Sequence, residues 1–258
     1  MGFFTASSLL TPILRESSVV AEMILRDQCI LGIEGSGHSI SVGLMKRGIP
    51  IGELFDNSGF PASRTLLHYI DTLLYQCRTK KEELQGICLT LGPGSFTSMR
   101  VSLSVAEAIG LGLHIPLYGI DELTLTANTL PFYPFPIKVV KNAYKGEIYT
   151  ASFETADGAA KRLDELNLVT PRRFLQDLRD NELVLGNGLD RVLAENSASV
   201  NRRMRWNASF SRQVGGIDVI EYFLDSAAKE PSDIPLEPIY VRLSEAELNY
   251  RARFGPFA

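Results

Sequence analysis

The amino-acid sequence predicts an α/β protein with two lobes, in each of which three antiparallel strands precede alternating helices and strands. Three observations support this prediction. Short apolar or alternating runs follow one another closely between residues 29 and 55. Two long helical patterns then alternate with short apolar runs between residues 63 and 120. After a proline-rich break, a partly similar order of strands and helices begins again.

The first lobe is predicted to open with three antiparallel strands joined by short turns. Residues 29–34 form a short apolar run that ends in Gly35-Ser36-Gly37. From Ile40 to Leu44, apolar side chains alternate with Ser and Gly, which is typical of a half-buried strand. A turn at 46–48 leads to a third predicted strand, 49–55.

Helices and strands alternate in the rest of the first lobe. Their order is helix 63–77, strand 86–91, helix 96–113, strand 115–120 and helix 122–130. A tight Gly92-Pro-Gly94 turn precedes the second of these helices, and Asp121 is expected to cap the third.

The second half repeats this order in part. Residues 137–140 and 146–153 indicate a pair of linked strands. Thr170-Pro171 is typical of a helix start, with the helix running to about Arg179, and 182–185 indicates a further strand. This succession of elements is that of the actin-like and sugar-kinase (ASKHA) fold, an α/β fold of two βββαβα-type lobes.

The lobes are expected at 29–120 and 121–258, with three prolines at 131–136 beside the boundary. A return of the last segment to the first lobe stays open. Residues 1–28 have no basic start and no long apolar stretch, so a secretory signal is not expected. We interpret them as a dispensable extension of the chain.

The composition limits the classes of function. The chain has 258 residues, 45% of them hydrophobic and 22% charged, and its net charge is −4. A broad basic face for nucleic acid is therefore not expected, although a local contact within a complex stays open. Cys29, Cys77 and Cys88 lie in apolar runs without C-x-x-C spacing, which indicates reduced thiols and a cytoplasmic protein. No apolar run is long enough to span a membrane, so no membrane partner is expected.

The loop after the first strand is a candidate phosphate loop. In actin-like phosphotransferases an acidic residue at this place holds the metal of bound ATP, and the backbone that follows surrounds phosphate. Glu34, Gly35, Ser36 and Gly37 are the candidates here. Many strands end in a glycine-rich turn, so a purely structural role is the alternative.

The turn from Gly92 to Thr97 is a second candidate. Gly92 and Gly94 allow backbone conformations that other residues avoid, and Ser95 or Thr97 could cap the helix that follows. Its spacing is not that of a P-loop and no lysine follows. An anion site and a plain helix start are both compatible with it.

The two first-lobe helices are apolar over wide arcs. The arc on helix 63–77 is wider than one core contact needs. On helix 96–113, small residues recur at every fourth position, which lets another backbone approach. One such stripe is Ser98, Ser102, Ala106 and Gly110, and a second is Ser104, Ala108 and Gly112. Burial within the monomer and an additional partner interface both remain possible interpretations.

Other sites are disfavoured. His38, His68 and His114 have neither metal-ligand nor peptidase spacing, so no metal site is expected. The run Arg202-Arg-Met-Arg-Trp206, with Phe210 and Arg212, mixes cations and aromatic rings as an RNA contact does. We interpret it as a solvated loop.

Four stretches resemble the TsaB family, also called YeaZ, of bacterial tRNA threonylcarbamoyladenosine biosynthesis. The turn and helix start Gly92–Arg100 is the most specific of them. The others are the helix pattern at 63–74, the strand Gly146-Glu-Ile-Tyr149 and the C-terminal Pro238-Ile-Tyr-Val-Arg242. The resemblance extends from about residue 29 to residue 242.

The resemblance implies a two-lobed actin-like fold without independent catalysis. Members of the family pair, through the two first-lobe helices, with the related subunit TsaD, which transfers a threonylcarbamoyl group to an adenosine beside the tRNA anticodon. A small ATPase, TsaE, joins the complex. The chain departs from the family pattern at Glu34-Gly35, where Asp-Thr is usual, and at Ala62, Ser98 and Asn142-Ala-Tyr144. We therefore expect Glu34, Gly35, Ser36, Gly92, Gly94, Ser95 and Thr97 to form vestigial nucleotide-type loops.

The leading hypothesis is thus a non-catalytic subunit that binds and activates a TsaD-like transferase. The chain is expected to bind no cofactor firmly, with ATP and magnesium only at a partner subunit or subunit interface, to contact tRNA through the complex and to form a homodimer when alone. The alternative is an actin-like ATP-dependent small-molecule kinase. The expected partner interface is Leu66, Ile70, Leu73, Leu74, Met99, Ser102, Leu103, Ala106 and Gly110.

Overall fold

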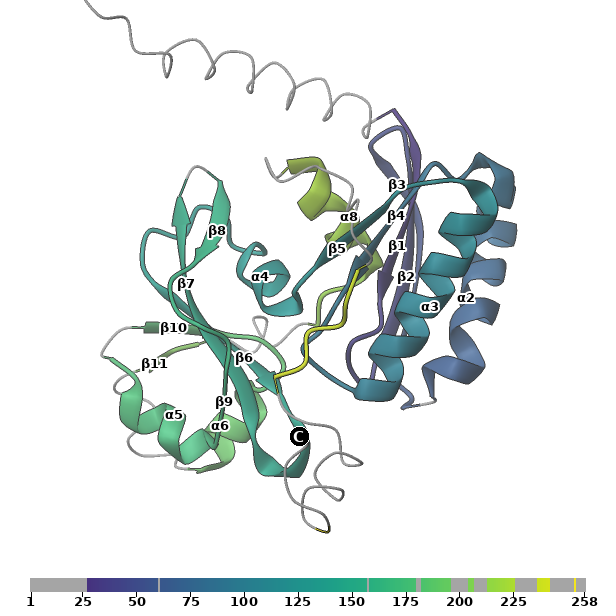
Figure 1. The fold of residues 1–258 in the computed structure, drawn as a ribbon. Helices are drawn as coiled ribbons and strands as arrows, with labels where there is room; N and C mark the ends of the chain where they lie inside the picture. Colours follow the sequence, from purple (N-terminus) through teal and green to yellow (C-terminus); the bar gives the residue numbers. More distant parts are fainter. Residues whose placement is uncertain are drawn as a thin grey trace, which may run out of the picture.

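The structure is a computed structural model with two lobes, each containing one sheet (Figure 1). It describes residues 27–59, 61–156, 158–179, 182–195, 204–206, 213–225, 236–241 and 253. The predicted extension at 1–28 lies almost wholly outside these residues, as do Arg202, Phe210, Arg212 and Arg242.

The first sheet has the strand order β3-β2-β1-β4-β5. β1 pairs with β2 and β2 with β3 in antiparallel fashion, whereas β1, β4 and β5 run parallel. Buried aliphatic side chains fill β1, β2 and β4, which therefore form the centre of the lobe. The strands are β1 (Cys29–Glu34), β2 (Ile40–Lys46), β3 (Ile49–Asp56), β4 (Gly86–Thr90) and β5 (Leu117–Ile120).

Helices cover both faces of this sheet. α2 (Ala62–Gln76) and α3 (Phe96–Leu113) lie side by side on one face and share a core with β1, β2 and β4. α8 (Gly216–Asp225) covers the other face, close to the strands (Figure 1). A Cβ on Gly32 would lie 1.9 Å from the carbonyl oxygen of Gly216, so only glycine allows this approach.

The second sheet has the order β11-β10-β6-β7-β8, and β9 also pairs with β7. Its elements repeat part of the first lobe, with β6 and β7 antiparallel and β6 parallel to β10. α5 and α6 pack on one face through a separate core. The elements are β6 (Ile137–Asn142), β7 (Ile148–Ala156), β8 (Ala159–Arg162), β9 (Asn167–Val169), α5 (Pro171–Asp177), β10 (Glu182–Leu185), α6 (Leu189–Glu195) and β11 (Met204–Arg205).

α4 (Glu122–Ala127) lies between the lobes and belongs to both cores. Leu123 and Ala127 are buried among second-lobe strands, whereas Leu125 packs with α8 and the first sheet. Asp121 caps the helix by accepting a hydrogen bond from the Thr124 amide, as predicted. Two short 3₁₀ turns, η1 (Lys81–Glu83) and η2 (Tyr144–Gly146), complete the described elements.

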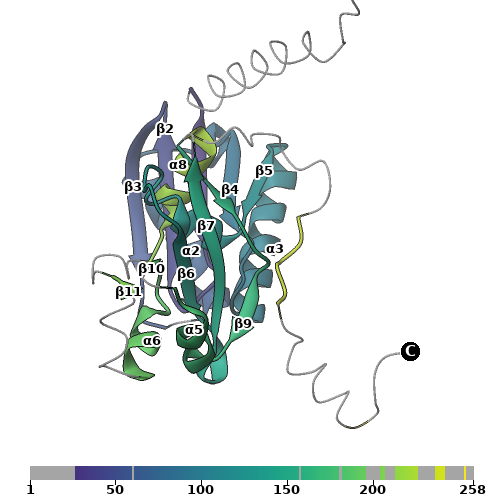
Figure 2. The same ribbon diagram turned by 90° about the vertical axis from the view of Figure 1, so that its left-hand side faces the viewer.

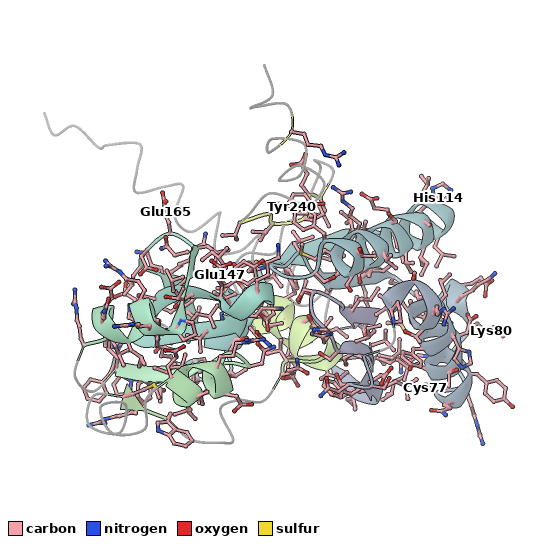
Figure 3. The ribbon with its side chains drawn as sticks, turned by 90° about the horizontal axis from the view of Figure 1, so that it is seen from below. Cys77, Lys80, His114, Glu147, Glu165 and Tyr240 are labelled. Atoms are coloured by element: carbon pink, nitrogen blue, oxygen red, sulfur yellow. The ribbon has the colours of Figure 1, made fainter. Side chains whose placement is uncertain are left out.

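The segment 236–241 returns to the first lobe and runs beside α3 (Figure 2). The Ile239 amide donates to the Leu91 carbonyl over 2.8 Å. Tyr240 stacks on Phe96, with 4.4 Å between ring centroids, and its hydroxyl accepts from Arg100 Nε. Figure 3 shows Tyr240 near one end of α3 and His114 at the opposite end.

The α/β actin-like fold class is confirmed, and several predicted boundaries are corrected. β6 runs to Asn142 rather than to 140, and β7 covers 148–156 rather than 146–153, because a 3₁₀ turn at 144–146 separates the two strands. β5 begins at Leu117 rather than at 115, because Pro116 has no amide hydrogen to donate to a ladder. α4 ends at Ala127 rather than at 130, where the Asn128 side chain donates to the Thr124 carbonyl. α5 ends at Asp177, where Leu178 turns extended.

Candidate functional site

A cleft of about 870 Å³ lies between the two lobes. Its first-lobe wall comprises the loop after β1, the end of β3 and the turn before α3. Its second-lobe wall comprises the end of β6 and the start of α6, and the residues leading into α8 close one side. Polar lining residues used below are Ser36, Gly37, Gly94, Ser95, Lys141, Asn142 and Asn187.

Buried charges form the floor of this cleft. Glu34, at the end of β1, accepts hydrogen bonds through Oε1 from the Ser36 amide and, over 2.5 Å, from Ser36 Oγ. Lys141, at the end of β6, donates from Nζ to the same Ser36 oxygen over 2.6 Å. Its ammonium also lies 3.1 Å from Glu122 Oε2 of α4. Residues from the two lobes and from the helix between them thus meet in one network.

Burial sets the electrostatics of this network. The Lys141 and Glu122 side chains are only 4% and 6% exposed. Loss of solvent raises the pKa of Glu122, the Lys141 ammonium opposes that shift, and the nearby Glu34 carboxylate adds to it. Burial, aided by the nearby Glu34 carboxylate, therefore favours the neutral form of Glu122 more than water would, in spite of its ion pair with Lys141.

The two candidate phosphate loops of the first lobe lie together and contact each other tightly. A Cβ on Gly94 would lie 1.7 Å from the Ser36 carbonyl oxygen, which also accepts from the Ser95 amide. A Cβ on Gly35 would lie 2.1 Å from Ser102 Oγ. The glycines therefore serve close packing between the loop after β1, the turn before α3 and α3 itself.

The remaining loop residues have local structural roles. Ser95, and not Thr97, caps α3 by accepting from the Ser98 amide, and Thr97 is exposed within the first turn. Gly92 has a positive φ of 103°, and its carbonyl accepts from the Glu122 amide. This contact ties the turn to α4.

The turn after β10, which contains Asn187, links two elements of the second lobe. Asn187 Oδ1 accepts a hydrogen bond from the Asn142 amide over 2.9 Å. The Asn142 side chain in turn accepts from Arg191 Nε. These contacts join the end of β6 to the start of α6 at the second-lobe wall of the cleft.

Lys141 and Glu122 were not predicted as site residues from the sequence. Lys141 follows the apolar run of β6, and Glu122 opens a short helix, where an acid is common. A lysine at a buried position of a strand was the available signal. Its two partners lie 19 and 105 residues away in the chain, so pattern alone could not supply them.

The structure corrects the predicted partner interface. All nine predicted residues are buried inside the chain and face the first sheet or its loops. Leu66, Ile70 and Leu73 are at most 3% exposed, and Ala106 is fully covered. The apolar arcs of both helices are therefore used by the lobe's own core. The predicted interface residues now assigned to this core are Leu66, Ile70, Leu73, Leu74, Met99, Ser102, Leu103, Ala106 and Gly110.

The opposite side of the same helix pair is exposed and carries few charges. Leu67 of α2 is 58% exposed and Leu111 of α3 is 78% exposed. Ser104, Ala108 and Gly112, the second small-residue stripe, are exposed on α3 as well. A Cβ on Gly112 would meet nothing within 4 Å. We call these five residues, Leu67, Ser104, Ala108, Leu111 and Gly112, the outer helix face.

Two other kinds of site, a membrane-spanning helix and a metal centre, are considered for the described part of the chain. No helix there has both the length and the apolar character that crossing a membrane requires. No group of three or more His, Cys, Asp or Glu side chains there is placed to hold a metal ion.

The chain matches a known family. Residues 62–213 match the model of TsaD, tRNA N6-adenosine threonylcarbamoyltransferase. This match covers the helix pair, Lys141 and Glu122 of the cleft floor and every described strand of the second sheet.

Curated relatives and solved structures agree with this match. The Bacillus subtilis tRNA threonylcarbamoyladenosine biosynthesis protein TsaB is 24% identical over 86% of this chain and 97% of its own length. The Escherichia coli TsaB is 22% identical over 62% of this chain and 71% of its own. A Pseudomonas aeruginosa protein with similarity to peptidase YeaZ has the same fold, with a TM-score of 0.67, 17% identity and coverage of 83% and 100%.

Proposed function

The chain belongs to the TsaB family, within the wider threonylcarbamoyltransferase family whose model it matches, and we propose that it is the accessory subunit of a TsaD-like transferase. In this role it binds the transferase and activates it for N6-threonylcarbamoyladenosine modification of tRNA in the cytoplasm. The transferase performs the chemistry. The chain contacts tRNA only as part of the complex, which a TsaE-like ATPase joins.

The outer helix face is the observation that carries this proposal. Arg100 and Glu107 are the only charged residues of the 18-residue α3. Arg100 lies over the rings of Phe96 and Tyr240, and Glu107 is exposed at the border of the outer helix face. Small side chains at 104, 108 and 112 let a partner's backbone come close, and Leu67 and Leu111 supply apolar area. A related subunit with the same helix pair would present a matching face, so a four-helix contact is the expected geometry.

The same reasoning predicts the state of the isolated chain. A neutral, partly apolar face that fits a related subunit also fits a second copy of itself through a two-fold axis. We therefore propose that the chain forms a homodimer through the outer helix face when its partner is absent. The partner and the second copy compete for one surface.

A charge in the middle of the outer helix face tests the proposal. Ala108→Glu places a carboxylate where the partner would cover it, and burying an unpaired charge costs about 3–5 kcal/mol. That corresponds to a loss of affinity of at least about 100-fold. The measurement is light scattering after size exclusion of the full chain mixed with the TsaD homologue of the same cell.

Ala194→Glu is the matched control, because Ala194 is an exposed alanine of α6 on the second lobe. We expect it to leave the complex intact. Equal affinity of the two variants would show that the outer helix face is not the interface. If the wild-type chain gave no complex but bound ATP in a metal-dependent way, the small-molecule kinase alternative would replace the proposal.

A further inference from the structure

The actin-like fold implies a metal-bound nucleotide in the cleft between the lobes, next to the acid that ends the first strand. In this chain that acid is Glu34, and its Oε1 already accepts two hydrogen bonds from Ser36. On the cleft side of Ser36 stands the Lys141 ammonium, 2.6 Å from Ser36 Oγ. The place next to the acidic loop is thus taken by a positive charge that belongs to the chain.

We infer that Lys141 is a tethered cation that replaces the metal of the ancestral site and fixes the two lobes in one relative position. This inference is independent of the proposed function, because it concerns the cleft and not the outer helix face.

The donor set does not fit a magnesium-bound polyphosphate. Magnesium needs oxygen ligands in near-octahedral geometry, including carboxylate oxygens that are free to turn toward it. Glu122 is buried against the ammonium, and Glu34 is held by Ser36. A divalent ion would have to share this buried space with the ammonium, and like charges in a region shielded from water repel strongly.

The position of Lys141 explains why it acts between the lobes. Lys141 lies opposite Tyr149 in the ladder between β6 and β7, and the backbone of its neighbours Val140 and Asn142 bonds to the turn after β10, so the lysine is fixed to the second sheet. Ser36 is fixed to the first lobe through the contact between its carbonyl and the Ser95 amide. A rotation of one lobe against the other would pull Nζ away from Ser36 Oγ and leave the buried ammonium with one hydrogen-bond partner fewer, which is unfavourable.

The test compares two lysines of the same strand. Lys141→Met removes the interlobe contact, whereas Lys138→Met removes a hydrogen bond to Ser152 that lies wholly within the second lobe. Spin labels at Gln76 of α2 and Gln176 of α5, both exposed, report the distance between lobes. The background carries Cys77→Ser, because Cys29 and Cys88 are buried, and excess unlabelled chain suppresses distances between copies.

We expect Lys141→Met to shift the distance distribution to longer and broader values, and Lys138→Met to leave it at the wild-type position. Equal distributions for wild type and Lys141→Met would overturn the inference, and so would equal shifts in both variants. If Lys141→Met does not fold, Ser36→Ala is measured instead, because it removes the hydroxyl that accepts the hydrogen bond from Lys141. A shift of its distance distribution to longer values supports the inference, and an unchanged distribution overturns it.

A second readout tests the replacement of the metal. Calorimetric titration of the wild-type chain with magnesium and a non-hydrolysable ATP analogue is expected to give no metal-dependent binding. Magnesium-dependent binding to the wild-type chain would overturn the inference. Neither readout depends on the transferase partner, so a failure here is distinguishable from a failure of the proposed function.

Discussion

The cleft floor buries two carboxylates, Glu34 and Glu122, but only one ammonium, that of Lys141. The Lys141 ammonium pairs with Glu122 and reaches Glu34 through the Ser36 hydroxyl, and all three charged side chains are nearly inaccessible to solvent. Such a network stabilises the fold only while every member keeps its partners. Because burial raises the pKa of Glu122 while Lys141 lowers it and Glu34 and Asp121 raise it, this carboxyl is the member whose charge folding disfavours.

This imbalance predicts a pH dependence of stability. A carboxyl with a raised folded-state pKa contributes stability below its unfolded pKa, and the contribution is lost as the pH rises through the folded pKa. Glu122→Gln keeps the shape without the charge. From about pH 5 to pH 8, the free energy of unfolding of the wild type should therefore fall relative to that of Glu122→Gln. Urea unfolding at several pH values measures this difference.

Glu83→Gln provides a control for which the expected pH dependence of the stability difference has the opposite sign. Hydrogen bonds from Lys46 and the Lys80 backbone lower the pKa of the half-buried Glu83, so its contribution to stability is lost as the pH falls. A difference between wild type and Glu122→Gln that stays constant over the range would contradict the assigned environment of Glu122.

Among the elements, the returning segment 236–241 and the start of α3 depend on each other. Tyr240 stacks on Phe96, and Arg100 lies over both rings while donating to the Tyr240 hydroxyl. The Ile239 amide adds a backbone bond to the end of the first sheet. These contacts hold the C-terminal segment beside the helix that carries the outer helix face.

Removal of the ring tests the contribution of this contact. Tyr240→Ala should lower the free energy of unfolding by about 1–2 kcal/mol, since an aromatic pair contributes about 0.5–1.5 kcal/mol beyond its buried area. Tyr240→Phe keeps the stack and loses only the hydrogen bond from Arg100, so its loss should be smaller. Chemical denaturation of both variants measures the effects, and equal stability of Tyr240→Ala and wild type would contradict the described packing.

The elements also show what the sequence could predict. The strands β1 to β4 and the helices α2 and α3 follow from strong periodicity, capping by Ser95 and the glycine-proline turn. The side of α3 that packs against the sheet could not be predicted from the sequence. Its apolar and small residues surround most of the helix, so only the position of the sheet decides that Ala106 is buried and Ala108 is exposed.

Other elements gave weaker signals. β8, β9 and β11 have two to four residues each, which is too short for a period to emerge. α8 is strongly amphipathic, but its packing on the first sheet is a contact between distant parts of the chain. The cleft floor was likewise only half predictable: the acidic loop was recognised, whereas Lys141 required the second lobe to be placed.

At the scale of the whole molecule, the two proposals concern two separate surfaces. The cleft is filled at its floor by the chain's own cation and carboxylates. The outer helix face lies on the far side of the first sheet from α8 and carries few charges. This division fits a subunit whose fold is retained from nucleotide-binding proteins and whose action is exerted through contact with a related subunit.

The most direct test of this account is the rate at which the TsaD-like subunit of the same cell transfers the threonylcarbamoyl group to tRNA, with and without this chain. The account predicts that an equimolar amount of the wild-type chain or of Ala194→Glu raises the rate, and that Ala108→Glu raises it far less. A transfer rate that is the same with and without the chain would contradict it.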